Sequence, residues 1–132
     1  QFVLSFPSRR SSVLWYFPYN VAPQLPQRLD TLRRHCEAVG RDPEQIEVSE
    51  QTLMILGRNQ RDLQQKIAAA KAMLGAIFDI DQTALKGTPD QLIEAIRARS
   101  LQGVTFFTTL FGDLNQPETL ELFAEKVVPA FR

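Results

Sequence analysis

Apolar residues recur at helical spacing in four stretches of the chain, and runs of aliphatic, β-branched or aromatic residues separate these stretches. The first two stretches end at Gly40 and Gly75, and glycine favours the end of a helix. The third follows the sequence GTPDQ, in which Thr88 is a typical N-cap residue and Gln91 completes a capping box. The fourth begins at Pro117. The spacing therefore predicts four helices, over residues 25–39, 63–74, 89–102 and 117–131.

Three apolar runs are expected to form strands: residues 15–19 (WYFPY), Ile46–Leu56 and residues 104–111 (VTFFTTLF). Pro18 limits the first run to a short strand or to a strand end. The second run ends in four consecutive apolar residues, which indicates burial on both faces, as in a parallel sheet. Because strands and helices alternate along the chain, the predicted fold class is α/β with a parallel sheet.

The predicted sheet is too small to be covered on both sides. Parallel strands need cover on both faces, and the predicted helices can cover only one of them. The sequence therefore predicts an incomplete α/β unit whose second face needs partners outside these elements. Residues 76–86, which include Asp79 and Asp81, are expected to form a loop or a short turn.

Residues 1–14 (QFVLSFPSRRSSVL) do not follow the pattern of the rest of the chain. Arg9 and Arg10 follow the apolar residues, which is the reverse of the order in a secretory signal. Residues 5–14 resemble SFPTRRSSDL, the translation of a common sequencing adaptor, at eight of ten positions. We therefore expect residues 1–14 to derive from an adaptor and residues 15–132 to be the natural segment. The alternative is a genuine strand, FVLSF, followed by a basic turn.

Composition excludes several classes of function. The 132 residues fit one domain, and 15 basic and 15 acidic residues give a formal net charge of zero. This balance argues against binding to nucleic acid or to a membrane surface through bulk charge. A single cysteine, Cys36, and a single histidine, His35, exclude an internal disulfide and a Cys-rich or two-histidine metal site. No apolar run approaches the ~20 residues of a membrane helix, and we expect a cytoplasmic protein without a metal.

Three blocks of the sequence resemble a known family. They are LRRHCEAVGRDPEQIEVS within residues 25–49, GTPDQLIEAIRARSLQGVTFF at residues 87–107 and ETLELFAEKVVPAFR at residues 118–132. In this order and at this spacing they resemble the C-terminal part of the luciferase-like monooxygenases. These are flavin- or deazaflavin-dependent oxidoreductases with a (β/α)8 (TIM) barrel fold.

The resemblance implies an incomplete barrel. It matches the three predicted strands to the sixth, seventh and eighth strands of the family, so the other strands would provide the missing cover. The intact parent would bind flavin mononucleotide (FMN) or a deazaflavin together with a small-molecule substrate, and the cofactor would carry out the redox chemistry. We expect this chain alone to bind no cofactor, to be inactive and to self-associate through its exposed apolar faces and edges.

Candidate site residues follow from the barrel resemblance, because barrel chemistry lies at the carboxyl ends of the strands. Trp15 could form a wall beside a planar ring, and Arg58 could hold a phosphate or carboxylate, so both are candidate cofactor-binding residues. The candidate substrate-binding residues are Tyr16, Phe17, Thr109 and Phe111. The alternatives are core packing for the aromatic residues and a solvated loop position for the arginine.

The other polar residues give no catalytic assignment. Thr88 is interpreted as a helix cap, Asp79 and Asp81 as solvated carboxylates, and His35 as an exposed neighbour of a buried Cys36. No pair of nucleophile and base can be assembled, so the catalytic residues stay unassigned. Two other functions remain open: a complete small α/β module for binding or oligomerisation, and a barrel enzyme of another class.

Overall fold

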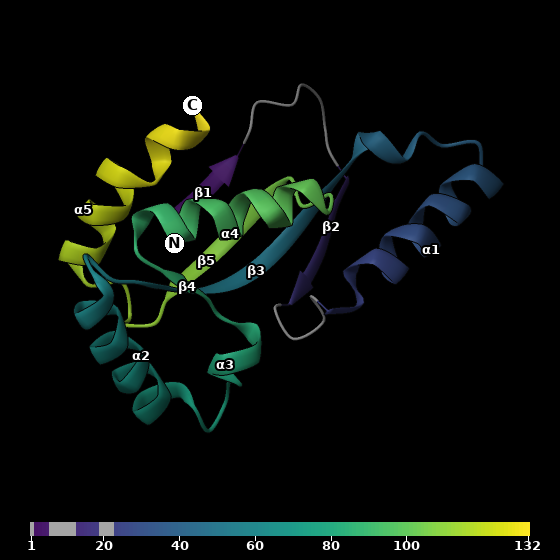
Figure 1. Cartoon of the computed structure of the whole chain (residues 1–132). Coiled ribbons are helices and arrows are strands. Elements are labelled where there is room, and N and C mark those ends of the chain that lie inside the picture. Colours follow the sequence, from purple (N-terminus) through teal and green to yellow (C-terminus); the bar gives the residue numbers. More distant parts are fainter. Residues whose placement is uncertain (1, 6–12, 19–22) are drawn as a thin grey trace.

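The structure is a computed structural model that describes residues 2–5, 13–18 and 23–132 (Figure 1). Its strands are β1 (Phe2–Ser5), β2 (Val13–Pro18), β3 (Ile46–Leu56), β4 (Leu85–Gly87) and β5 (Phe106–Phe111). Its helices are α1 (Leu25–Ala38), α2 (Gln60–Leu74), α3 (Ile80–Thr83), α4 (Pro89–Leu101) and α5 (Pro117–Lys126), with short 3-10 helices η2 (Pro43–Gln45) and η3 (Val128–Phe131). None of the helices in these ranges has the length and apolar character needed to cross a bilayer.

One sheet of five strands organises the fold. The strands follow the order β1-β5-β3-β2, and β4 pairs with the C-terminal end of β3. The pairs β2–β3, β3–β4 and β3–β5 are all parallel, whereas β1 pairs with β5 in the antiparallel direction. The predicted α/β class with a parallel sheet is therefore confirmed, and the three predicted strands are neighbours in the predicted order.

The predicted helix ends agree with the backbone geometry. Gly40 follows α1 with φ +67° and Gly103 follows α4 with φ +108°, so both occupy the left-handed region where glycine is favoured. At the start of α4 the side-chain oxygen of Gln91 accepts a hydrogen bond from the backbone N–H of Thr88 at 3.0 Å. Local signals of this kind depend on a few adjacent residues, which is why the sequence identifies them.

Some boundaries differ from the prediction. Residues 76–86, predicted to be irregular, contain α3 and β4, which are too short to show a periodic pattern. β5 begins at Phe106 rather than at residue 104, and the Thr105 side-chain hydroxyl accepts from the Val48 N–H at 3.0 Å. α1 ends at Ala38, which leaves Val39 76% exposed instead of on the apolar face.

Part of the segment predicted to be adaptor-derived lies within the sheet. Residues 13 and 14 begin β2, and β1 pairs with β5 in the register Phe2↔Thr109 to Ser5↔Phe106. Residues 1 and 6–12 lie outside the described residues.

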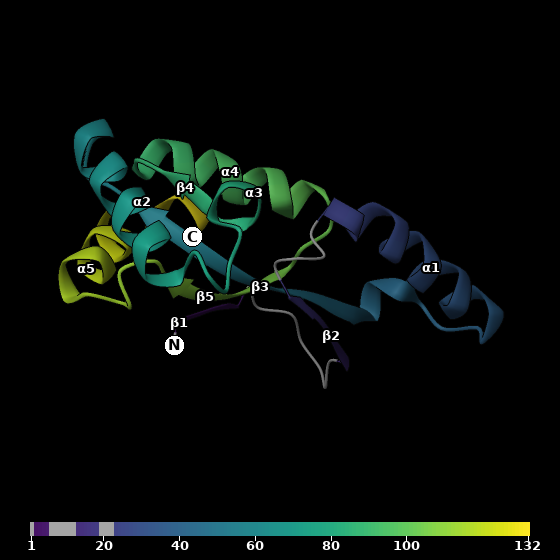
Figure 2. The ribbon, with the colours of Figure 1, turned by 90° about the horizontal axis from the view of Figure 1, so that it is seen from below.

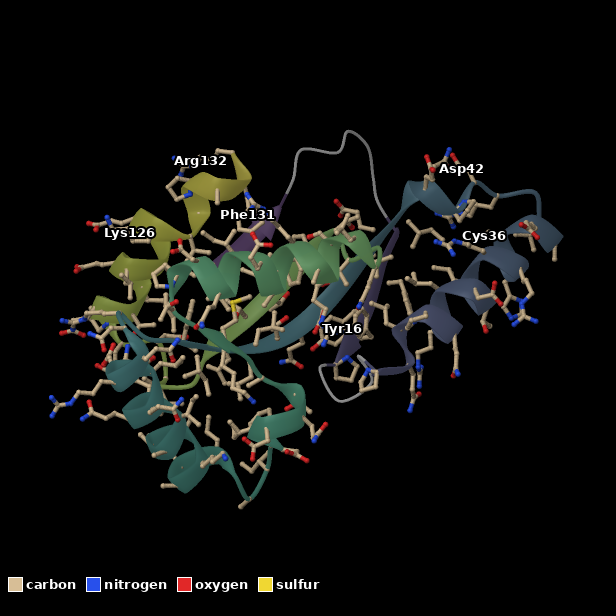
Figure 3. The ribbon with its side chains drawn as sticks, in the orientation of Figure 1. Tyr16, Cys36, Asp42, Lys126, Phe131 and Arg132 are labelled. Atoms are coloured by element: carbon tan, nitrogen blue, oxygen red, sulfur yellow. The ribbon has the colours of Figure 1, made fainter. Side chains whose placement is uncertain are left out.

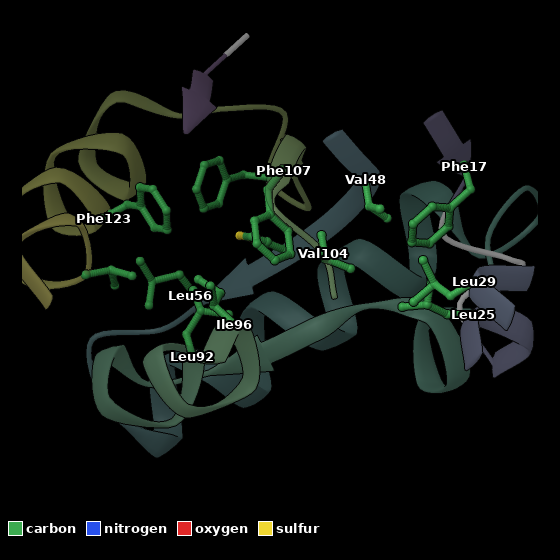
Figure 4. Close-up of a cluster of buried hydrophobic side chains, with 13 residues drawn as sticks. Phe17, Leu25, Leu29, Val48, Leu56, Leu92, Ile96, Val104, Phe107 and Phe123 are labelled. Carbon is green, nitrogen blue, oxygen red and sulfur yellow. The ribbon is translucent and has the colours of Figure 1, made fainter. Parts of the chain in front are cut away.

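One face of the sheet packs against helices, and we call it the packed face. It presents Trp15 and Phe17 of β2, the even-numbered residues of β3, and Phe107, Thr109 and Phe111 of β5, because side chains alternate along each strand and the registers align these positions. Helices α1, α4 and α5 cover this face (Figure 4). The buried cluster is Phe17, Leu25, Leu29, Val48, Met54, Leu56, Leu92, Ile96, Val104, Phe107, Phe111, Phe123 and Val127.

The opposite face, which we call the second face, is covered only in part. At the C-terminal end of β3, Leu53 and Ile55 pack against α2 and α3 in a smaller cluster with Leu63, Ala70, Leu74 and Ile80. Nearer the start of the strands, Leu14 is 45% exposed and Tyr16 is 49% exposed. Figure 2 shows α1 and α4 together on one side of β2 and β5. This uneven cover agrees with the predicted incomplete unit.

Truncating a side chain should lower the free energy of unfolding by different amounts on the two faces of β5. Phe107 is 1% exposed inside the packed face, so Phe107→Ala should destabilise the fold by about 3–5 kcal/mol. Phe106, the adjacent residue, is half-buried on the second face, and Phe106→Ala should cost less than half as much. Urea unfolding followed by circular dichroism measures both. Equal losses would contradict the assignment of the faces.

Candidate functional site

A hollow on the second face is the candidate site. It has a volume of about 270 Å3 and is lined by Gln51, Thr108, Thr109, Leu110 and Asn115. The parallel pairing of β3 and β5 places Gln51 directly opposite Thr108. All five lining residues are uncharged, and Gln51, Thr108 and Asn115 carry side chains that can donate and accept hydrogen bonds. Thr109 borders the hollow although its side chain belongs to the packed face. The hollow therefore suits a ligand with neutral polar groups and an apolar surface.

Tyr16 extends the site onto β2 (Figure 3). Its hydroxyl donates a hydrogen bond of 2.5 Å to Oε1 of Gln51. This bond occupies the carbonyl oxygen of the amide and so fixes which way the side chain points. Within the described residues no group accepts from Nε2 of Gln51, so this N–H pair is available to a ligand.

Ser49 adds a buried hydroxyl to the same face. The residue is 0% exposed and lies opposite Tyr16 on one side and Phe106 on the other. Its Oγ has no hydrogen-bond partner among the described residues. Buried hydroxyls in folded proteins are normally paired, so the absence of a partner at this position is unusual.

The loop after β5 closes one end of the hollow. Leu114 and Asn115 have φ values of 58° and 63°, in the left-handed region that non-glycine residues rarely adopt. The Asn115 side-chain oxygen accepts from the Phe111 N–H at 2.9 Å, which holds the turn against the end of β5. This bond explains why Asn115 borders the hollow although it lies beyond the strand.

A second polar cluster holds the carboxyl ends of the strands together. Lys66 of α2 donates to the Leu56 carbonyl oxygen at 3.1 Å and to Thr119 Oγ1 at 2.5 Å, and lies 3.5 Å from Asp113 Oδ2. Thr119 in turn donates to Asp113 at 2.5 Å. The ammonium is therefore surrounded by three protein oxygens, two as hydrogen-bond acceptors and one as an ion-pair partner. We interpret this cluster as a structural connection between α2, α5 and the two strand ends.

The structure brings one predicted site residue, Tyr16, to the second face. Trp15, Phe17 and Phe111 lie on the packed face, where Phe17 and Phe111 are 2% and 1% exposed and the Phe111 ring is 5.1 Å from that of Phe123. Thr109 borders the hollow, but its hydroxyl donates to the Thr52 carbonyl oxygen at 3.2 Å. The roles predicted for these residues remain predictions.

Arg58 lies just beyond the end of β3. It is exposed, and its backbone N–H donates to Asp62 Oδ2 at 2.8 Å. No described residue pairs with its guanidinium, and its predicted role in holding an anion stays a prediction. The structure neither places it in the hollow nor gives it a bound partner.

Sequence reasoning missed Gln51, Thr108 and Asn115. A signal for Gln51 was present, because the polar run SEQT at residues 49–52 interrupts an otherwise apolar strand. The face to which each of these residues points depends on register with β2 and β5, which one strand by itself does not reveal. Asn115 carries no local signal, since its role depends on a turn.

The other polar residues considered from the sequence have structural contacts. Asp79 Oδ1 accepts from the Gln82 N–H at 3.2 Å, and Asp81 lies 2.7 Å from Lys71 Nζ. The hydrogen bond from Lys71 lowers the pKa of the exposed Asp81 carboxyl. His35 is exposed and Cys36 is buried. In the described ranges no three His, Cys, Asp or Glu side chains are grouped so that they could hold a metal ion.

Glu50 is an unusual titratable group on the packed face. It is 0% exposed, and neither carboxylate oxygen has a hydrogen-bond partner among the described residues. It forms an ion pair with Arg99 of α4, whose Nε lies 3.6 Å from Oε2 of Glu50. Burial raises the pKa of Glu50 to about 7, and the positive charge of Arg99 opposes this increase only in part.

The raised pKa predicts how stability changes with pH. A folded-state pKa of about 7, above the ordinary value of 4.5, means that protonated Glu50 stabilises the fold fully below pH 4.5. This contribution, about 3 kcal/mol, should be lost as the pH rises through 7. The difference in unfolding free energy between the unmodified chain and Glu50→Gln should therefore shift by about 2–3 kcal/mol between pH 5 and pH 8.

The control for this measurement is Glu125→Gln, because Glu125 is exposed. Its unfolding free energy should follow that of the unmodified chain at both pH values. A Glu50→Gln variant that shows the same pH dependence as the unmodified chain would contradict a raised pKa.

Comparison with known proteins gives matches of structure only. No family model matches the chain, and no curated protein is similar to it in sequence. The coenzyme F420-dependent tetrahydromethanopterin reductase from Methanopyrus kandleri has a TM-score of 0.62 and 16% identity, over 82% of this chain and 42% of that chain.

Two further solved structures are similar. Monooxygenase RslO1 from Streptomyces bottropensis has a TM-score of 0.64 and 21% identity, over 92% of this chain and 42% of that chain. An F420-dependent secondary alcohol dehydrogenase, solved with an F420-acetone adduct, has a TM-score of 0.60 and 14% identity, over 96% of this chain and 50% of that chain. The chain thus spans half or less of each of these proteins, and the similarity shows that it has the fold of an incomplete (β/α)8 barrel.

Proposed function

We propose that this chain is the C-terminal part of a luciferase-like oxidoreductase that uses a deazaflavin or FMN, and that residues 15–132 are its natural segment. In this proposal the second face of the sheet is one wall of the cofactor and substrate site. The observation that carries the proposal is the partly exposed face itself, since its hollow presents uncharged hydrogen-bonding groups between parallel strands. Two of the similar solved structures are named as F420-dependent enzymes, which favours a deazaflavin.

The side chains on this face fit a planar redox cofactor. Phe106 and Leu110 are half-buried apolar residues against which one side of a ring could lie. Gln51 and Thr108, which line the hollow, supply hydrogen-bond donors beside them. Such a cofactor transfers a hydride or activates oxygen when it is bound.

The contribution of this chain would be orientation and exclusion of water. The Tyr16 hydroxyl fixes the Gln51 amide so that its N–H groups face the ligand side. The loop held by Asn115 would limit access at the carboxyl end of β5. The other walls would come from barrel strands that precede β2, so we propose that this chain alone is inactive.

A second candidate function is supported by β1. This strand pairs with the outer edge of β5, where a closed barrel would place its first strand. An occupied edge favours the alternative of a small α/β module for binding or oligomerisation. The two proposals make opposite predictions about cofactor binding by a longer protein expressed from the source DNA of this chain.

The decisive experiment recovers the source DNA upstream of codon 15 and expresses the longer product. We expect further strand–helix units upstream and saturable binding of coenzyme F420 or FMN, measured by the change in cofactor fluorescence. Gln51→Leu should weaken this binding about fivefold, because one hydrogen bond contributes about 1 kcal/mol. The control Leu101→Lys should leave binding unchanged, because Leu101 is 89% exposed on α4. A longer product that binds neither cofactor would contradict the proposal.

The isolated chain provides a separate prediction. Titrated with FMN or with coenzyme F420, residues 1–132 should show no saturable change in fluorescence at micromolar concentrations, because most of the walls of the site are absent. Micromolar affinity of this chain alone would show that its own residues complete a cofactor site.

A further inference from the structure

The two edges of the sheet are not equivalent. On one side β1 pairs with β5 and so covers the outer edge of that strand. On the other side β2 is the last strand, and among the described residues no strand pairs with its outer edge. The backbone N–H and C=O groups along that edge are therefore available for pairing with another chain.

The sequence of β2 has little of the protection that edge strands usually carry. Natural edge strands carry charged residues, particularly lysine, or proline, or are interrupted by bulges. The strand reads VLWYFP and contains no charge. Leu14 and Tyr16 are also 45% and 49% exposed on the second face, next to the open edge. Pro18 has no N–H, so pairing would end there and involve residues 13–17.

We propose that two copies of this chain associate through the outer edges of β2, paired antiparallel about a two-fold axis. The second copy is the occupant because an antiparallel strand edge is complementary to itself and because the absence of charge in β2 removes repulsion between identical strands. The pairing would also bring Leu14 and Tyr16 of the two copies onto one continuous face, where their exposed apolar surface would be buried.

The assembly ends at two copies because the described part of each chain has one long open edge, that of β2. If both edges were long and open, copies would add without limit and form a fibril. Here β1 covers the edge of β5 and is itself the last strand on that side, but it has only four residues, and β4 has only three. The inference does not depend on the proposed enzymatic function. In a longer barrel protein, another strand of the same chain would pair with the edge of β2. Dimerisation of the present chain and cofactor binding by the longer protein are therefore independent results, and either prediction can be contradicted without the other.

Light scattering during size-exclusion chromatography, over about 5–200 µM, tests the dimer. We expect the full chain to have twice the mass of one copy, and Tyr16→Lys and Leu14→Lys each to have the mass of a single copy. Lysine at an edge opposes pairing by charge. Circular dichroism and thermal melting establish that each variant is folded, and the two lysine variants serve as independent tests if one of them fails to fold.

Matched controls distinguish pairing through the edge of β2 from non-specific association. Tyr16→Phe should remain a dimer, because the aromatic surface and the edge are kept. Leu101→Lys should also remain a dimer, since Leu101 is 89% exposed on α4 and does not belong to β2. A monomeric full chain, a dimer that survives both lysine variants, or equal loss in Leu101→Lys would overturn the proposal.

The limit of two copies is tested with the double variant Val3→Pro/Leu4→Pro. Val3 and Leu4 lie opposite Thr108 and Phe107 of β5. In an antiparallel pair the N–H groups of adjacent residues point in opposite directions, so one of these two residues donates to β5, and two prolines are needed to remove that donor with certainty. Removing this donor should open the second edge, and assemblies larger than two copies should then form. A variant that remains a dimer would show that β1 does not limit the assembly.

Discussion

Burial of β3 on both of its faces is the constraint on which the rest of the structure depends. Residues 53–56 are all 2% exposed or less, and they alternate between the cluster on the packed face and the cluster beneath α2 and α3. The strand also pairs with β5 along one edge and with β2 and β4 along the other. Every other element is positioned by its contact with this central strand, directly or through one neighbour.

The same constraint explains why the candidate site lies where it does. Cover from α2 and α3 ends near Leu53, so the part of the second face nearer the start of β3 is left with less cover. Two polar side chains, Ser49 and Gln51, lie on that part of the strand, and a buried polar group without a partner is a cost to the fold. The Tyr16 hydroxyl pairs with Gln51. The resulting surface is partly apolar and partly hydrogen-bonding, and the proposed cofactor site rests on this combination.

Two carboxylates of the strand region lie in different surroundings. Glu50 is directed into the packed face, where it pairs with Arg99 and where burial raises its pKa. Asp113 lies at a strand end, where Lys66 and Thr119 both contact it. A buried carboxylate without hydrogen bonds is a cost to the fold that the surrounding apolar contacts must offset. Its position on the packed side argues that it has a structural rather than a catalytic role.

Periodic spacing and local end signals were sufficient to predict the main helices, the three parallel strands and the ends at Gly40 and Gly103, because these depend on residues within a few positions of one another. The resemblance to a barrel family also led to the correct fold class. The direction in which each strand side chain points was decided only in three dimensions. A shift of one residue in register exchanges the two faces of a strand, so the positions of Tyr16 and Gln51 on one side and of Phe17 and Phe111 on the other depend on long-range pairing that no local pattern encodes.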